Sequence, residues 1–346
     1  MKILILKPSS LGDVIHALPV LRLLKLHFRD AQIYWWIDAG LAPLIEGDPD
    51  LAGVVIFKRK RWSNPLYWPE MVRSIQWMRA QHFDWVIDLQ GLLRSAFFGW
   101  VARGKFFVGL DNAFEGGREG AHAFYDLAVS STVSAHAIER CLSVLPALDV
   151  PVHKNFQWLP ERPQIAAAIK TKWPEAGTSR WIALQPGARW ATKCWPARNF
   201  ADLVRLFAQK FPDVRFAVMG SADDKSLGET ISSAAPERVL NLCGQTSLAE
   251  MIEWLRLCEL MITNDTGPMH VAAALGIPVV ALFGPTNPRF TGPYGQLENV
   301  LRIELPCAPC FKSYCTWKKP MECLVDITPA KVFEFAVKKL GNRNSG

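Results

Sequence analysis

The sequence lacks any uninterrupted apolar run near the ~20 residues that a membrane-spanning helix needs. Its first residues, Met1–Pro8, have the pattern of a short strand, without the long apolar core and small-residue cleavage site of a signal peptide. We therefore expect a protein that stays in the cytoplasm and whose contact with a membrane is at most peripheral.

A common nucleotide-binding motif is also missing, and a common metal-binding motif occurs only once. No Gly-x-Gly-x-x-Gly follows an apolar strand, and the first strand-to-helix loop has a single glycine, Gly12, which argues against a nucleotide-dependent oxidoreductase. The one Asp-x-Asp motif, Asp48–Asp50, lies in a turn-like stretch before a strand. We interpret it as a turn and not as a metal site.

Cysteine is concentrated in one late stretch, which holds four of the eight: Cys307, Cys310, Cys315 and Cys323. In a reducing cytosol cysteines are thiols or metal ligands rather than disulfides. The first pair has CxxC spacing, but the other intervals are irregular and no second CxxC completes a zinc ribbon. A small metal site and free thiols in a structured loop both stay open, and we assign neither a metal nor a cofactor.

The overall composition is that of a globular protein. Of 346 residues, 50% are hydrophobic and 21% are charged, and the length suits two domains. Lys and Arg exceed Asp and Glu by 39 to 32, a net charge of +7. This excess suits an anionic partner, whether phosphates, nucleic acid or an acidic membrane surface.

Apolar runs of strand length alternate with amphipathic stretches of helix length, in two series. The first series predicts strands at Ile3–Leu6, Ile33–Ile37, Val54–Phe57 and Trp85–Leu89, and helices at Val14–Phe28 and Glu70–Gln81. The second predicts strands at Trp181–Gln185, Arg215–Met219, Leu260–Thr263 and Val279–Phe283, and helices at Ala197–Lys210, Asp224–Ala235, Leu248–Leu257, Pro268–Ala274 and Pro329–Leu340. Continuous apolar strands separated by helices indicate an α/β fold with parallel, doubly wound sheets.

A Pro- and Gly-containing passage over residues 149–179, with one short helix at Gln164–Lys172, separates the two series. We therefore expect two Rossmann-like domains, residues 1–155 and 156–346. Packing of the last helix back on the first domain stays open. Two such domains facing each other would leave a central cleft at the carboxyl ends of both sheets, where ligands of open α/β folds bind.

The loop Lys7–Asp13 joins the first strand to the first helix. Ser10 and Gly12 permit a tight turn with free N–H groups near a helix N-terminus, which favours an anion. Asp13 lies where the helix begins and has two compatible interpretations, a helix cap and a general base.

Two loops of the second series have the features of phosphate sites. Gln185–Pro196 combines the free backbone of Gly187 with the charges of Arg189 and Lys193, although a solvated basic loop has the same composition. In the other loop, Thr263–His270, a hydroxyl and N–H groups lie at a helix start, where a diphosphate would be stabilised. Its candidate donor-binding residues are Asp265, Thr266, Gly267 and His270. The aspartate would orient the loop or bind a hydroxyl, and the histidine is equally well explained by a structural role.

Together, six short segments resemble glycosyltransferase family 9, the ADP-heptose:lipopolysaccharide heptosyltransferases. They are Lys7–His16, Asp88–Gly91, Gln185–Ala188, Lys193–Pro196, Asn264–His270 and Phe283–Thr286, in family order. The resemblance implies a GT-B fold, with an N-terminal acceptor domain and a C-terminal nucleotide-sugar domain. It implies inverting transfer of heptose from ADP-L-glycero-D-manno-heptose to the Kdo/heptose inner core of lipopolysaccharide, at the cytoplasmic face of the inner membrane.

The resemblance also implies roles for residues. In the family, the aspartate matching Asp13 is the proposed base, the lysine matching Lys193 contacts the diphosphate, and the loop matching Asp265–His270 embraces the donor. Inversion needs one base for the acceptor proton and positive charge at the departing diphosphate, so no divalent metal is required.

The basic run Lys58, Arg59, Lys60 and Arg61, followed by Trp62 and further aromatics, reads as a loop after a strand. Such a charge run is usually a solvated face. In the family the corresponding region meets the anionic lipid-linked acceptor, and Trp beside Arg suits a headgroup boundary. Arg118, in a Gly-rich loop, is a further candidate for acceptor binding.

The expected partners are therefore ADP-heptose and a Kdo/lipid A acceptor, with no nucleic acid. One alternative is a glycosyltransferase that uses another nucleotide-diphosphate sugar for a different cell-envelope glycan. The loops that bind the phosphates contribute little to selection of the sugar. Another is a non-catalytic lipid- or nucleic-acid-binding module, which would leave Asp13 and the paired phosphate loops unexplained. The motifs do not distinguish addition of the first heptose from addition of the second.

Overall fold

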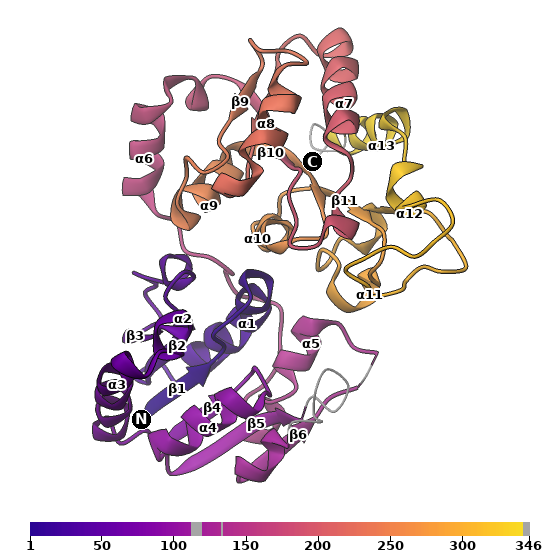
Figure 1. Ribbon diagram of the computed structural model, residues 1–346. Helices are drawn as coiled ribbons and strands as arrows, with labels where there is room; N and C mark the ends of the chain where they lie inside the picture. The colour runs from indigo at the N-terminus through magenta and orange to yellow at the C-terminus, as the bar shows by residue number, and fades with distance from the viewer. Residues whose placement is uncertain (112–119, 133, 342–346) are drawn as a thin grey trace. The chain divides into compact units, whose positions relative to one another are not determined.

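The structure is a computed structural model that describes residues 1–111, 120–132 and 134–341. Contacts divide the chain into two compact units, Met1–Pro160 and Glu161–Gly346, where the sequence predicted a boundary after residue 155. Each unit is built on a six-stranded parallel sheet with helices on its faces (Figure 1). No helix among the described residues is long and apolar enough to cross a membrane.

The first unit has the strand order β3-β2-β1-β4-β5-β6. Its strands are β1 (Lys2–Leu6), β2 (Gln32–Asp38), β3 (Gly53–Phe57), β4 (Trp85–Asp88), β5 (Phe106–Asp111) and β6 (Leu127–Ser130). Its α-helices are α1 (Leu11–His27), α2 (Arg59–Trp62), α3 (Trp68–Ala80), α4 (Leu93–Ala102) and α5 (Ala137–Leu142). Short 3₁₀ turns are η1 (Ala42–Leu44), η2 (Pro65–Tyr67), η4 (Ala121–Phe124) and η5 (Pro146–Leu148).

Alternate strand residues of this unit point to opposite faces of the sheet. On one face, Leu6, Trp36 and Phe57 pack with Met78 of α3 and Phe98 of α4. Helices α1 and α5, which contact each other, cover the other face. Helices α2, α3 and α4 therefore form one outer layer of the unit.

The second unit repeats the same winding, with the order β12-β11-β10-β7-β8-β9. Its strands are β7 (Arg180–Gln185), β8 (Val214–Val218), β9 (Val239–Asn241), β10 (Cys258–Asn264), β11 (Val279–Phe283) and β12 (Val300–Arg302). Its α-helices are α6 (Pro163–Lys172), α7 (Ala197–Lys210), α8 (Lys225–Ser232), α9 (Leu248–Leu257), α10 (Gly267–Ala274), α11 (Pro288–Thr291), α12 (Glu322–Val325) and α13 (Pro329–Gly341). Short 3₁₀ turns are η6 (Pro174–Gly177), η7 (Ala191–Lys193), η8 (Ala222–Asp224) and η9 (Leu297–Asn299).

Counted within each unit, both sheets have the strand order 3-2-1-4-5-6 of the Rossmann fold. The predicted α/β class with two Rossmann-like, doubly wound domains is therefore confirmed. The last helix, α13, buries Val332, Ala336 and Leu340 in the core of its own unit, beside Phe207 and Phe216. A further contact of α13 with the first unit stays a prediction.

One expectation about the first unit changes in the structure, and a second gains a partner. The basic run is not a loop, because Arg59–Trp62 forms the helical turn α2, and Trp62 is buried against Phe57 and Phe98 rather than at a headgroup boundary. The Asp-x-Asp turn holds a buried cation. Arg22 of α1 donates to Asp48 Oδ1 at 2.6 Å and to Asp50 Oδ2 at 2.6 Å.

Candidate active site

The topology itself selects the loops where ligands should bind. In a doubly wound sheet the binding crevice lies at the carboxyl edge where the strand order reverses. In the first unit this point lies between β1 and β4, and in the second unit between β7 and β10. The loops that follow these four strands carry most of the residues singled out in the sequence.

In the first unit, the loop after β1 caps helix α1. Ser10, and not Asp13, is the N-cap residue, and Asp13 is the third residue of the helix. Asp13 Oδ2 accepts two hydrogen bonds of 2.7 Å, from the N–H and from the hydroxyl of Ser10. The second carboxylate oxygen, Oδ1, has no hydrogen-bond partner in the part of the chain that the structure describes. One oxygen therefore caps the helix, and the other is available to accept a proton.

The neighbouring loop, after β4, is held by buried polar contacts. Lys7 Nζ donates to the carbonyl of Leu89 at 2.8 Å and so joins the two loops. Asp88, which is fully buried, accepts hydrogen bonds from the N–H of Gln90 at 2.8 Å and from the hydroxyl of Tyr125 at 2.9 Å. Burial raises the pKa of the Asp88 carboxyl. This aspartate therefore stabilises the loop.

In the second unit, three loops meet at one carboxylate. Lys193 Nζ lies 2.7 Å from Asp265 Oδ2, and the Thr286 hydroxyl donates to the same oxygen at 2.6 Å. The lysine ammonium also lies 4.9 Å from the centre of the Trp190 ring. The structure thus brings Lys193 and Asp265 into direct contact, although their motifs predicted separate roles. Thr286, which the sequence analysis placed only within a matching segment, is part of this cluster.

Asn264 joins two of these loops through its buried side chain. Its Nδ2 donates to the carbonyl of Pro186 at 2.6 Å, and its Oδ1 accepts from the N–H of Trp195 at 3.0 Å. An amide can donate and accept at once, which neither Asp nor a hydrocarbon side chain could do here. The position of the Lys193 loop against β10 therefore depends on Asn264.

Gln185 and Gly187 lie at the start of the loop after β7. The Gln185 amide donates to the Gly187 carbonyl at 3.3 Å, and its buried Oε1 has no partner among the described residues. A Cβ on Gly187 would lie 2.1 Å from the Asp224 carboxylate, so any larger residue here would displace the Asp224 side chain. Asp224 caps η8 by accepting from the N–H and hydroxyl of Ser221, each at 2.8 Å. Asp224 was not predicted from the sequence, although Ser221-x-x-Asp224 repeats the spacing of Ser10-x-x-Asp13.

Helix α10 begins beside the Lys193–Asp265 pair. Thr266 is its N-cap residue, and the Thr266 side chain makes no capping hydrogen bond. Pro268 has no N–H, and the N–H of Met269 donates to the Thr266 carbonyl at 3.1 Å. The Thr266 hydroxyl and the N–H of Gly267 are the donors that this helix start can offer to an anion. His270 lies one turn further and is buried.

The four predicted acceptor cations of the first unit differ in their environment. Lys58 and Arg61 both pair with Glu70 of α3, and Arg61 also lies 4.1 Å above the Tyr67 ring. Arg59 and Lys60 are exposed and form no ion pair within the described residues. Lys58 and Arg61 therefore stabilise the α2–α3 junction, whereas Arg59 and Lys60 can bind an anion. Arg118 lies outside the described residues.

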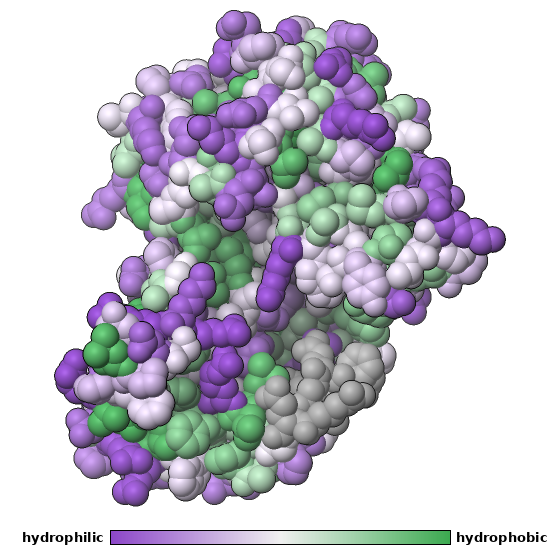
Figure 2. Space-filling model, in the orientation of Figure 1, coloured by the Kyte–Doolittle hydropathy of each residue, from purple (hydrophilic) through white to green (hydrophobic). Residues whose placement is uncertain are grey.

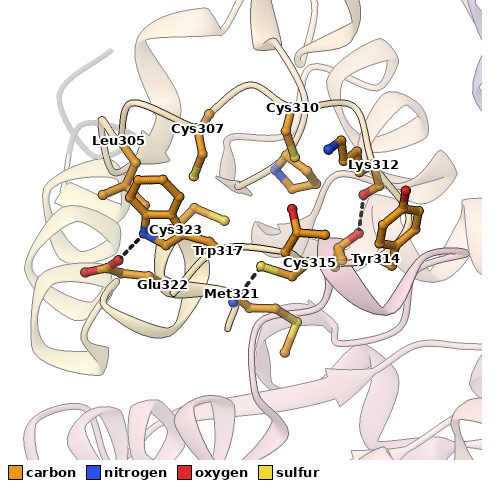
Figure 3. Close-up of a pocket in the computed structure, with 14 residues that line it drawn as sticks. Leu305, Cys307, Cys310, Lys312, Tyr314, Cys315, Trp317, Met321, Glu322 and Cys323 are labelled. Atoms are coloured by element: carbon orange, nitrogen blue, oxygen red, sulfur yellow. Dashed lines mark hydrogen bonds between the residues drawn. The ribbon is translucent and has the colours of Figure 1, made fainter. Parts of the chain in front are cut away.

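The cysteine-rich segment lies against the donor loops of the second unit. Cys307, Cys310, Cys315 and Cys323 line one pocket of about 230 Å³ (Figure 3), and all eight cysteines are free thiols. No group of three or more His, Cys, Asp or Glu in the described ranges is arranged to hold a metal ion. Burial, with smaller effects of the neighbouring thiols, raises the pKa of Cys323 to about 11.

This segment is fixed to the site by backbone contacts. The Thr192 hydroxyl donates to the carbonyl of Lys312 at 2.9 Å, and the N–H of Phe311 donates to the carbonyl of Pro285 at 2.8 Å. Thr192 is next to Lys193 in the sequence, and Pro285 is next to Thr286. The cysteine-rich segment therefore supports both loops that hold the Asp265 cluster.

Comparison with known proteins now decides the family. A family model described as glycosyltransferase family 9 (heptosyltransferase) matches residues 71–320. The chain belongs to glycosyltransferase family 9. It is 34% identical over 334 residues to lipopolysaccharide heptosyltransferase 1 of Pseudomonas aeruginosa, covering 93% of this chain and 89% of the relative. It is 28% identical to lipooligosaccharide heptosyltransferase 2 of Campylobacter jejuni, covering 99% of each chain.

Solved structures of heptosyltransferases share the fold. The E. coli ADP-heptose lps heptosyltransferase II superposes with a TM-score of 0.81 at 24% identity, covering 99% of this chain and 100% of that one. The E. coli heptosyltransferase WaaC with ADP gives a TM-score of 0.76 at 24% identity, covering 98% and 100%. The predicted GT-B fold and the enzyme class, a glycosyltransferase, are therefore both confirmed.

Proposed function

We propose that this family 9 enzyme transfers heptose from ADP-L-glycero-D-manno-heptose to the Kdo/heptose inner core of lipopolysaccharide, with inversion at the anomeric carbon. The observation that carries the proposal is the Lys193–Asp265–Thr286 cluster beside the start of α10. A cation, a hydroxyl and a helix N-terminus together suit a diphosphate. The names of the relatives, which include lipopolysaccharide heptosyltransferase 1, support the sugar and the acceptor.

The second unit would bind the donor. As the bond between the anomeric carbon and the diphosphate oxygen breaks, negative charge builds on the departing ADP. Lys193 and the N–H of Gly267 would stabilise this charge, and the dipole of α10 adds to their effect. Donors that are fixed before the reaction stabilise the transition state without reorganising during it. Asp265 and Asn264, which hold the two loops in place, supply this rigidity.

Asp13 of the first unit would act as the general base. Its Oδ2 is oriented by Ser10, so that Oδ1 can accept the proton of the acceptor hydroxyl. The acceptor oxygen then forms the new bond to the anomeric carbon on the face opposite the diphosphate. The proton moves to Asp13 and ADP leaves with the electron pair of the broken bond, so inversion needs only this one base.

We propose further that transfer does not depend on a divalent metal, because Lys193 and the α10 start supply the charge stabilisation. We expect EDTA to leave the rate of transfer unchanged. Loss of transfer with EDTA, with recovery on adding Mg²⁺ or Mn²⁺, would overturn this part of the mechanism.

The acceptor side would operate at the cytoplasmic face of the inner membrane, through peripheral contact. Arg59 and Lys60 would bind the phosphates and carboxylates of a Kdo/lipid A acceptor, because they are exposed and without ion pairs among the described residues. The lipid chains of such an acceptor stay in the bilayer, so the enzyme has to reach the headgroup region.

The test begins with donor selection. Purified protein is heated with a panel of nucleotide sugars, and ADP-heptose should raise the unfolding temperature most, since a ligand that binds only the native state stabilises it. Transfer is then measured with Kdo-lipid A acceptors that carry or lack the first heptose, and the product anomer is assigned by NMR. Preference for another nucleotide sugar, or retention of the anomeric configuration, would overturn the proposal.

A further inference from the structure

Helix α4 has an apolar stripe on its outer face. Leu93, Phe97 and Trp100 are 44%, 41% and 57% exposed, and their spacing of four and three residues places them on one side of the helix. The opposite side, which includes Phe98 and Ala102, packs on the sheet. The outer face of a helix in a globular protein is normally polar, whereas α4 is apolar on both sides.

The stripe continues into the aromatic side chain of the neighbouring 3₁₀ turn η4. The Phe97 and Trp100 rings lie 6.4 Å apart, and Trp100 is 6.0 Å from Phe124 of η4. The layer of α2, α3 and α4 also exposes Trp68 and Trp77 of α3. Figure 2 shows apolar residues gathered over α4 with hydrophilic residues beside them. Contiguous exposed apolar surface of this kind marks an interaction site.

Positive charge is concentrated in the same part of the chain. Residues 58–105, which span α2, α3 and α4, contain nine Lys and Arg against three Asp and Glu, whereas the whole chain has a net charge of +7. Arg73 of α3 and Arg94 of α4 are exposed, and neither has an ion-pair partner in the ranges that the structure describes. The segment that contains this layer therefore carries +6 of the net charge of +7.

We propose that the α2–α3–α4 layer is the surface by which this enzyme docks on an anionic lipid bilayer, with Leu93, Phe97 and Trp100 entering the headgroup region and Arg73 and Arg94 binding lipid phosphates. Aromatic side chains at a membrane surface enter the headgroup region, and basic residues around them bind the lipid phosphates. A second copy of the chain would set two strongly positive faces against each other. An acidic protein or nucleic acid would leave the apolar stripe in water.

The inference rests on the proposed function, because it names the membrane surface on which that function depends. Helix α2 follows β3 directly, at the carboxyl edge of the sheet, and carries Arg59 and Lys60. Docking through the α2–α3–α4 layer would therefore bring these two cations to the headgroups from which the acceptor sugar projects. The same layer would thus serve membrane binding and acceptor capture.

The experiment measures partition onto vesicles of phosphatidylcholine, with and without phosphatidylglycerol, by flotation. We expect the triple variant Leu93→Ser, Phe97→Ser, Trp100→Ser to lose at least about tenfold in partition onto the mixed vesicles, since three apolar side chains no longer leave water. Leu297→Ser is the matched control, because Leu297 of the second unit is 43% exposed, and it should bind as the parent does. Equal binding of the triple variant and the parent would overturn the proposal.

The charge contribution has its own pair of variants. Arg73→Gln with Arg94→Gln should lower partition onto phosphatidylglycerol vesicles by roughly ten- to thirtyfold at low salt, at about 1 kcal/mol for each cation near a charged surface. Lys331→Gln with Lys338→Gln, two exposed cations of α13, should not change it. A loss that is as large for the α13 pair would mean that only net charge matters, and would overturn the assignment to this layer.

Two further measurements keep the outcomes distinct. Hydrogen exchange of the parent enzyme should show protection of α4 when vesicles are added, and an unprotected α4 would count against the proposal even if the variants unfold. Transfer to a deacylated, water-soluble acceptor should be normal in the α4 variant. If the parent binds vesicles through α4 but transfers no heptose, the proposed function fails and the docking surface stands. Self-association lost in the α4 variant would identify a dimer interface instead.

Discussion

The ammonium of Lys193 and the carboxylate of Asp265 form a 2.7 Å ion pair, in which the lysine side chain is 20% exposed and the aspartate 6%. The same carboxylate oxygen accepts the Thr286 hydroxyl. The negative charge of Asp265 is therefore paired with the positive charge of Lys193 within the site. Asp265 holds the lysine at the start of α10, and an incoming diphosphate would share the lysine with it.

Removing the lysine should have two separable effects. We expect Lys193→Ala to weaken ADP binding by about ten- to a hundredfold through loss of a charge-assisted hydrogen bond, and to lower the free energy of unfolding by about 1–3 kcal/mol because Asp265 is left without its cation. Adding Asp265→Asn to this variant should restore stability but not ADP affinity. Calorimetric titration and chemical denaturation measure the two effects. Lys172→Ala, which breaks a surface pair with Glu250, should leave ADP binding unchanged.

Asp13 can be tested against another capping carboxylate. We expect Asp13→Asn to lower turnover about 100-fold or more, the range for loss of a general base, with ADP affinity retained. Glu250 caps α9 by accepting from the Ser247 N–H at 2.7 Å, as Asp13 does from Ser10. Glu250→Gln should therefore cost similar stability without loss of turnover. Near-normal turnover in the Asp13 variant would reduce this residue to a helix cap.

The basic run divides into two pairs with different expected behaviour. Arg59→Gln with Lys60→Gln should raise the KM for a water-soluble anionic acceptor at low salt and leave the donor KM unchanged, because two unpaired cations are lost. The effect should fade as salt rises, since exposed charges are screened over about 8–10 Å. The second pair, Lys58→Gln with Arg61→Gln, should lower thermal stability, because Glu70 loses both of its ion-pair partners. An unchanged acceptor KM in the first pair would return this stretch to a solvated face.

The pattern within each segment predicted most of the central elements, although it missed β5 (Phe106–Asp111), an interior strand of the first sheet. Strand β11 (Val279–Phe283) is a continuous apolar run, and helices α7 and α9 have one apolar face, so the pattern within each segment decides its structure. The edge strands β6, β9 and β12 are short and partly exposed, and they have no such run. Helix α4 was not predicted because it is apolar on both sides and has no helical periodicity to detect.

The candidate site was predictable only loop by loop. Strand-to-helix junctions with Ser, Gly and Thr indicate anion sites locally, and this selected the loops after β1, β7 and β10. The pairs Lys193–Asp265 and Lys58–Glu70 join residues that are distant in sequence, so they depend on the tertiary fold. For the same reason the sequence could not separate Arg59 and Lys60 from the cations beside them. The catalytic and binding roles of these residues stay predictions.

Strand β4 ends at Asp88 and is directly preceded by Asp84, and the pKa values of these two aspartates shift in opposite directions. Burial raises the pKa of Asp88, at the carboxyl end, although Gln90, Gly91 and Tyr125 donate to it. At the amino end, a hydrogen bond from Lys105 lowers the pKa of Asp84, and the backbone N–H of Lys2 adds to this effect. The two residues should therefore contribute to stability with opposite dependence on pH.

For Asp88, the native state binds a proton that the unfolded chain releases, from the ordinary pKa near 4 up to the raised native pKa. Its contribution to the free energy of unfolding should fall as pH rises through this window, by at most about 1.4 kcal/mol per pH unit. Asp84 should do the reverse, because its contribution is present above the unfolded pKa and is lost as pH falls through the lowered native pKa. We expect Asp88→Asn to gain stability relative to the parent as pH rises from 4. Asp84→Asn should lose stability relative to the parent as pH rises through the acidic range below 4, where the parent gains the contribution of Asp84. Denaturant unfolding of all three proteins across pH measures both differences. If the Asp88→Asn difference did not change with pH, the carboxyl would have the same pKa in both states, and its burial would be compensated by its hydrogen bonds.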